Sequence, residues 1–202
     1  MTMCYSPENK VRGFTLVELL IAMAIGCVVL GALISTFVIQ SKAYDVQEQV
    51  AEMVQSARAA MDMMTREIRM AGYNPTGATF NGITYDAAQL QIRADLSGDG
   101  DTGDSNENIV YKYYGATDYQ IKRKTGGGYF QPFAENIQAF TFAYLEADGM
   151  TEVNTTDDND KIRQIRITIT ARTAKRDPDY SPNGGYRKYT LTSLITPPNL
   201  AY

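Results

Sequence analysis

Residues 14–39 read FTLVELLIAMAIGCVVLGALISTFVI, and only Thr15, Glu18, Ser35 and Thr36 in this run are polar. A helix needs about 20 consecutive apolar residues to cross the hydrocarbon core of a bilayer. The run is longer than that, so we predict a transmembrane helix over residues 14–39.

The charges on the two sides of this run differ. Lys10 and Arg12 lie immediately before it, whereas Lys42 after it is soon followed by Asp45 and Glu48. Segments rich in Lys and Arg stay on the cytoplasmic side of the membrane. We therefore expect a cytoplasmic N-terminus and an exported remainder.

Glu18 is the one ionisable acid or base within the run. A carboxylate at the centre of a membrane costs roughly 2.5–3.5 kcal/mol on insertion scales, so such a residue is a functional candidate that needs a partner. No Lys or Arg lies between Phe14 and Gln40, so the run holds no cation that could neutralise the charge. A new α-amino group, made by cleavage of the chain, would supply one.

Two simpler interpretations of the run explain less. A secretory signal would be cut near Ala22-Met23-Ala24, in the middle of the run, whereas such signals are cut just beyond a short apolar core. A plain single-pass anchor explains the hydrophobicity but leaves Glu18 unexplained.

The segment RGFTLVELL, residues 12–20, resembles the processing site of type IV prepilins and type II secretion pseudopilins. The resemblance implies that a prepilin peptidase cuts between Gly13 and Phe14 and methylates the new amine of Phe14. Residues 1–13 would be a leader peptide. Glu18 would be the assembly residue that pairs with the N-terminal amine of a neighbouring subunit. Glycine suits the cut because it presents no side chain to the peptidase.

The resemblance also implies partners and a location. The partners would be other major and minor pilins, the prepilin peptidase, the inner-membrane assembly platform and the inner membrane itself. The subunit would first span the inner membrane, with its globular domain in the periplasm, and would then enter an extracellular pilus filament.

Beyond the membrane run, the apolar residues become periodic at a spacing of three or four, as on one face of a helix. They are Val46, Val50, Met53, Ala57, Met61, Met64 and Ile68. We predict one helix from about Phe14 to Ala71 that ends at Gly72, with its amphipathic continuation over residues 40–72 packed on a sheet. Residues 47–53 and 66–73 resemble the stalk of PilW-type minor pilins, and J-type pseudopilins share this plan.

Residues 73–202 are predicted to form a β-rich globular domain, because several segments alternate between apolar and polar residues. These segments are 90–94, 109–113, 119–122, 140–144 and 165–171, with a final strand near 186–195. Turn-forming breaks separate them, so antiparallel meanders are expected. The fold class is α+β: a long N-terminal transmembrane and stalk helix packed on an antiparallel β-sheet domain, as in the pilin fold.

The loop DLSGDGDTGDSNE, residues 95–107, is dense in oxygen ligands. Its beginning resembles the first half of an EF-hand calcium loop, although position twelve is Asn106 and no helices flank it. We predict a calcium-binding hairpin loop with the ligands Asp95, Ser97, Asp99, Asp101, Asp104 and Glu107. The alternative is a solvated acidic hairpin, since Asp and Gly are also turn formers. Two smaller clusters are expected to be a hairpin tip (157–160) and a solvated strand end (122–124).

Composition excludes several functions. The absence of His rules out Ser-His-Asp catalysis and His-ligated zinc. Nineteen Lys and Arg against 23 Asp and Glu give a net charge of -4, so no nucleic-acid partner is expected. We predict a non-enzymatic minor type IV pilin that primes assembly at or near the pilus tip. A J-type type II secretion pseudopilin and a calcium-dependent tip adhesin are the alternatives.

Overall fold

The computed structural model describes residues 13–115 and 117–200. The predicted leader therefore lies outside the described residues, except for Gly13. The chain divides into two compact units between Val46 and Gln47. Helix α1 begins in the first unit and continues into the second.

Helix α1 spans Leu16–Met70 and contains both the apolar run and the periodic segment. Its buried residues begin at Met53 and follow the predicted spacing, which confirms that this face packs into a core. They are Met53, Ala57, Ala60, Met61, Met64, Glu67 and Ile68.

The helix ends at the predicted glycine. Gly72 has φ of +77°, a left-handed conformation that glycine adopts without steric cost, and its N–H donates to the carbonyl of Arg93 at 2.9 Å. A Cβ at Gly82 would overlap the backbone of Gly72, so the chain passes close to the helix end there. The acidic loop that follows Arg93 is thus tied to the end of α1.

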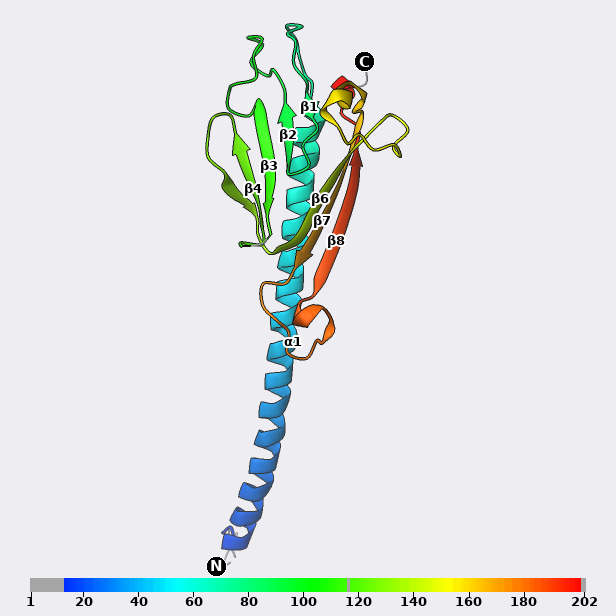
Figure 1. The fold of residues 1–202 in the computed structure, drawn as a ribbon. Helices are drawn as coiled ribbons and strands as arrows, with labels where there is room; N and C mark the ends of the chain where they lie inside the picture. The colour runs from blue at the N-terminus through cyan, green and yellow to red at the C-terminus, as the bar shows by residue number, and fades with distance from the viewer. Residues whose placement is uncertain (1–12, 116, 201–202) are drawn as a thin grey trace, which may run out of the picture. The chain divides into compact units, whose positions relative to one another are not determined.

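Two antiparallel sheets make up the rest of the second unit, and Figure 1 shows both of them beside the C-terminal part of α1. In each sheet the strands are ordered as they occur in the chain, which confirms the predicted meanders. The first sheet contains β1 (Ile83–Thr84), β2 (Gln89–Arg93), β3 (Asn108–Tyr114), β4 (Gln120–Thr125) and β5 (Gln131–Ala134). The second contains β6 (Ile137–Leu145), β7 (Gln164–Arg172) and β8 (Lys188–Ile195).

One hydrophobic core joins α1 to both sheets. Strand β7 alternates strictly between buried and half-buried residues, with Ile165, Ile167 and Ile169 facing the core. Two tyrosines add polar links between the sheets. The hydroxyl of Tyr113 on β3 donates to the carbonyl of Gln138 on β6 at 2.6 Å, and that of Tyr144 on β6 donates to the carbonyl of Gln89 on β2 at 3.1 Å.

The structure differs from the sequence prediction in three places. Strands β1 and β5 were not expected, because β1 has two residues and β5 contains Pro132, which is tolerated at a sheet edge. The cluster 157–160 is not a hairpin tip but part of the 3₁₀ helix η1 (Thr156–Lys161), within the long connection from β6 to β7. Further 3₁₀ turns are η2 (Pro182–Gly185) and η3 (Pro198–Leu200).

Candidate functional site

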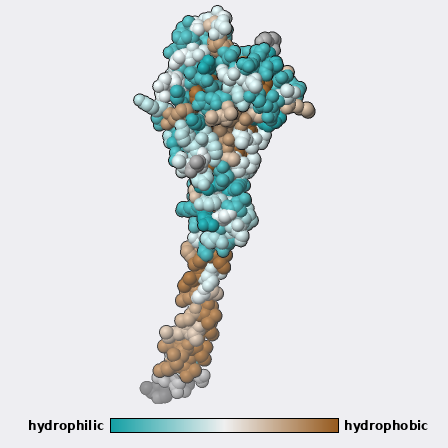
Figure 2. All heavy atoms as spheres, in the orientation of Figure 1, coloured by the Kyte–Doolittle hydropathy of each residue, from teal (hydrophilic) through white to brown (hydrophobic). Residues whose placement is uncertain are grey.

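The side chains of the apolar part of α1 are exposed. Large hydrophobic side chains from Phe14 to Ile39 are each about half exposed or more. Figure 2 shows these hydrophobic residues gathered on the N-terminal part of the helix. Among the described residues, α1 is the one helix long and apolar enough to cross a membrane. Burial of this surface requires lipid or apolar helices of other subunits.

Thr15 and Glu18 cap the start of α1. Oε2 of Glu18 accepts hydrogen bonds from the N–H of Thr15 at 2.9 Å and from its hydroxyl at 2.8 Å. In return, the N–H of Glu18 donates to Oγ1 of Thr15 at 3.2 Å. This reciprocal pattern is a capping box, which satisfies backbone donors that a helix start leaves without partners.

The other two polar side chains of the run also bond within the helix. Ser35 donates to the carbonyl of Gly31 at 2.9 Å, and Thr36 donates to that of Ala32 at 3.0 Å. Glu18 thus differs from them, because its hydrogen bonds leave a net negative charge. Among the described residues, no ion pair includes Glu18.

The predicted cleavage position lies just before the helix. Gly13 and Phe14 precede α1, and Phe14 is 88% exposed. A Cβ placed on Gly13 would meet no atom of the described chain within 4 Å. The bond between the two residues is therefore accessible from outside the helix.

In the acidic loop between β2 and β3, Asp95 organises the backbone. Asp95 is fully buried, and its carboxylate accepts hydrogen bonds from the hydroxyl of Thr76 (2.9 Å) and the N–H groups of Gly98 (2.7 Å) and Gly100 (3.1 Å). Burial raises the pKa of Asp95, but these hydrogen bonds outweigh burial and leave the pKa below its usual value. Asp95 therefore holds the loop against residues that follow α1.

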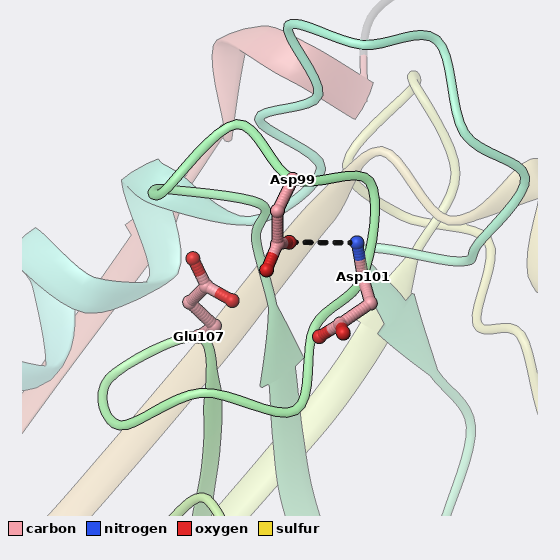
Figure 3. A group of neighbouring side chains, drawn as sticks. All are labelled: Asp99, Asp101 and Glu107. Carbon is pink, nitrogen blue, oxygen red and sulfur yellow. Dashed lines mark hydrogen bonds between the residues drawn. The ribbon is translucent and has the colours of Figure 1, made fainter.

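Three other acidic residues of the loop converge. One carboxylate oxygen from each of Asp99, Asp101 and Glu107 lies within 4.8 Å of the other two. Figure 3 shows these side chains on the loop, with the N–H of Asp101 bonded to Asp99 at 3.0 Å. The arrangement concentrates negative charge in a small volume and could hold a cation.

The remaining predicted ligands lie outside this group. Ser97 contributes its backbone N–H, which donates to Glu107 at 2.6 Å. Asp104 is exposed, and repulsion from Glu107, then from Asp99, raises its pKa. Asp95 is excluded because its oxygens already bind Thr76 and the backbone. Of the six predicted ligands, the structure brings together Asp99, Asp101 and Glu107.

A buried charged cluster was missed by the sequence prediction. Glu67 on α1 is 6% exposed and pairs with Arg123 on β4, with Nη2 to Oε1 at 2.7 Å. Tyr111 on β3 also donates to Glu67. Burial, followed by the bond to Glu67, raises the pKa of Tyr111. Arg123 is thus not part of a solvated strand end. The signal that could have predicted this cluster is the position of Glu67, an acidic residue that lies between Met64 and Ile68 on the apolar face of the helix.

The chain matches one known sequence motif and one known protein family. Residues 9–34 match the prokaryotic N-terminal methylation motif, and residues 46–196 match the family described as prepilin peptidase-dependent protein B. No curated protein matches the chain. A solved type IV-like pilin from Thermus thermophilus is similar, with a TM-score of 0.46 and 16% sequence identity over 73% of this chain and 98% of that one.

The methylation motif includes the predicted cleavage position and Glu18, while the family match takes in most of the second compact unit. The two matches are separated by residues 35–45 and together cover most of the chain. The match to residues 46–196 alone spans well over half of the chain. The chain therefore belongs to the prepilin peptidase-dependent protein B family and is a type IV pilin-like structural subunit rather than an enzyme.

Proposed function

We propose that the chain is a minor type IV pilin, which is cleaved, methylated and then incorporated at or near the pilus tip as a priming subunit. The observation that carries the proposal is an exposed apolar run, residues 14–39, that holds one carboxylate, Glu18, in the first turn of α1. The capping box with Thr15 needs only a hydrogen-bond acceptor at this position, whereas a subunit that packs against other N-terminal helices can also use the charge to bind their amines.

Processing would occur between Gly13 and Phe14. The methylation motif includes this bond, which lies in exposed chain immediately before the capped helix. Cleavage by the prepilin peptidase would remove residues 1–13 and leave a methylated amine on Phe14. The mature chain would then begin one helical turn before Glu18.

Orientation in the membrane follows from the flanking charges. Lys10 and Arg12 would keep the N-terminus in the cytoplasm, so the second compact unit would be exported to the periplasm. The inner-membrane assembly platform would then move the processed subunit into a filament of major and minor pilins.

Glu18 would form the contact that guides incorporation. Both hydrogen bonds from Thr15 reach Oε2, so Oε1 can accept a further bond. The amine of a neighbouring subunit would bind there as its helix leaves the bilayer. Two charges that are costly in an apolar environment would then neutralise each other.

Processing is tested by intact-protein mass spectrometry of the chain purified from cells with and without the prepilin peptidase. We expect loss of residues 1–13 and gain of one methyl group only when the peptidase is present. Gly13→Val should remain uncut because its side chain obstructs the peptidase. Normal pilus assembly by an uncut chain would contradict the proposal.

A gene deletion tests the role within the filament. Loss of nearly all surface pili, restored by the wild-type gene, would support a priming subunit. Normal pili with lost attachment would indicate an adhesin instead. Normal pili with lost protein secretion would indicate a pseudopilin of type II secretion.

A further inference from the structure

Glu107 carries a buried carboxylate oxygen without a partner. The residue is 2% exposed, and its Oε1 accepts the N–H groups of Leu96 (2.8 Å) and Ser97 (2.6 Å). Oε2 is buried and makes no hydrogen bond within the described chain. A buried polar atom without a partner is costly, and more so when it carries charge. This oxygen is therefore free to bind a cation.

Two neighbouring acidic residues add further negative charge around Glu107. Asp99 and Asp101 each place a carboxylate oxygen within 4.8 Å of one from Glu107. Each Asp accepts one backbone N–H through Oδ1, from Asp101 at 3.0 Å and Gly103 at 2.6 Å respectively. No ion pair among the described residues includes any of the three acids. Three like charges thus repel one another at short range.

We infer that the loop of residues 95–107 binds one calcium ion through Asp99, Asp101 and Glu107. Calcium prefers oxygen ligands at 2.3–2.6 Å, so oxygens on opposite sides of the ion lie about 5 Å apart. The spacing of the three carboxylates fits one such ion. Asp104, backbone carbonyls and water would complete the six to eight ligands that calcium takes. This inference goes beyond the proposed pilin function and does not depend on it.

The loop already has a frame that does not depend on the ion. Asp95 fixes the first half of the loop through Thr76, Gly98 and Gly100. Glu107, which immediately precedes β3, is held by the backbone N–H groups of Leu96 and Ser97. The ion would join the exposed arm that carries Asp99 and Asp101 to this buried base. Calcium is therefore expected to stabilise a loop that is largely preformed.

Calcium binding is tested on the full chain in detergent, first freed of metal with a chelator. Isothermal titration with calcium chloride should give one site with a Kd of about 10⁻⁴–10⁻³ M, as in extracellular calcium modules. Thermal unfolding followed by circular dichroism should shift upward by about 3–10 °C in 10 mM calcium. Absence of binding, or an equal shift with magnesium, would overturn the inference.

Two variants locate the site. Glu107→Gln keeps an acceptor for Leu96 and Ser97 but removes the charge, and Asp101→Asn changes an exposed residue. Both should weaken calcium binding at least tenfold and reduce the shift in Tm by about half or more. Without calcium, Glu107→Gln should unfold no lower than the wild type, because the repulsion is relieved. Asp157→Asn, an exposed control outside the loop, should keep the full shift. A full shift in both loop variants would overturn the assignment.

Discussion

At the scale of single residues, Glu18 combines two roles that have different chemical requirements. It completes a capping box with Thr15, which needs a hydrogen-bond acceptor. It also supplies the negative charge that the proposed assembly contact needs. Substitutions that remove one property and keep the other can separate the two roles.

Glu18→Gln should therefore leave cleavage largely intact and reduce incorporation into pili at least tenfold, because the amide accepts hydrogen bonds but cannot neutralise an amine. Thr15→Ala, which loses the cap hydroxyl and keeps the charge, should assemble at near-normal levels. The measurement is the amount of the subunit in sheared pili relative to the amount in cells. Efficient incorporation of Glu18→Gln would show that the charge is dispensable.

Glu67 is a second acidic residue whose role depends on a partner, because it forms a buried ion pair with Arg123. Oε1 of Glu67 binds Nη2 of Arg123 at 2.7 Å, and Oε2 accepts a weaker bond from Nε at 3.3 Å. The side chains of Glu67 and Arg123 are 8% and 19% exposed, so removal of either one leaves the other charge largely shielded from water. Such a loss typically costs about 3–5 kcal/mol, whereas replacement of both partners by apolar residues is often neutral.

Glu67→Met should lower the free energy of unfolding by about 3 kcal/mol because Arg123 is left without a counter-ion. The double variant Glu67→Met/Arg123→Met should recover part of this loss, because the charge of Arg123 is removed while the hydroxyl of Tyr111 still lacks its acceptor. Urea denaturation of the full chain in detergent measures both. Equal destabilisation in the single and double variants would argue against a coupled ion pair.

At the scale of elements, the connection between β7 and β8 is held by an ion pair and by a contact with α1. Arg187 binds Asp177, with Nη2 to Oδ2 at 2.8 Å, and the N–H of Lys175 donates to the side chain of Gln49 at 3.0 Å. The bond from Arg187 lowers the pKa of Asp177. The stability that this ion pair gives to the connection should therefore depend on pH.

A carboxylate with a lowered pKa in the folded state stabilises that state above its unfolded pKa, which is about 3.9 for Asp. This contribution is lost as the pH falls through the lower, folded pKa. Asp177→Asn should therefore reduce Tm at pH 7, and the difference from wild type should shrink toward pH 2–3. Thermal unfolding across this range checks the trend, with Asp179→Asn as an exposed control. A difference independent of pH would contradict the role of the charge.

At the scale of the whole molecule, the two units have opposite surface character. Every buried hydrophobic residue of the described chain lies at or beyond Met53, within the second unit. The first unit exposes its large apolar side chains instead. The core of the second unit therefore does not require the apolar run.

A fragment of residues 47–202 should fold and remain monomeric without detergent, because it keeps all the described core residues. The full chain should aggregate under the same conditions. Size-exclusion chromatography and circular dichroism measure both properties. An unfolded or aggregated fragment would show that residues before Gln47 contribute to the fold.

Contiguous patterns made much of this molecule predictable. The apolar run, the three- and four-residue spacing and Gly72 predicted α1 to within two residues at its start and one at its end. Alternation predicted β2, β3, β4, β6, β7 and β8, whereas β1 and β5 were missed because so few residues carry no clear period. In the acidic loop the density of Asp indicated a candidate site but not its geometry. Asp95 looks like a ligand in sequence, yet its partner Thr76 is 19 residues away.

By itself, the amino-acid sequence determined the fold class, the N-terminal methylation motif and the position of Glu18 within it, because each depends on residues close together in the chain. Tertiary structure alone decided which acids meet and which charges are buried. Glu67 reaches Tyr111 across 44 residues and Arg123 across 56. Glu107 approaches Asp99 only when the register of β2 with β3 brings the two ends of the loop together. Local periodicity specifies the faces of elements, but which side chains meet depends on how those faces pack.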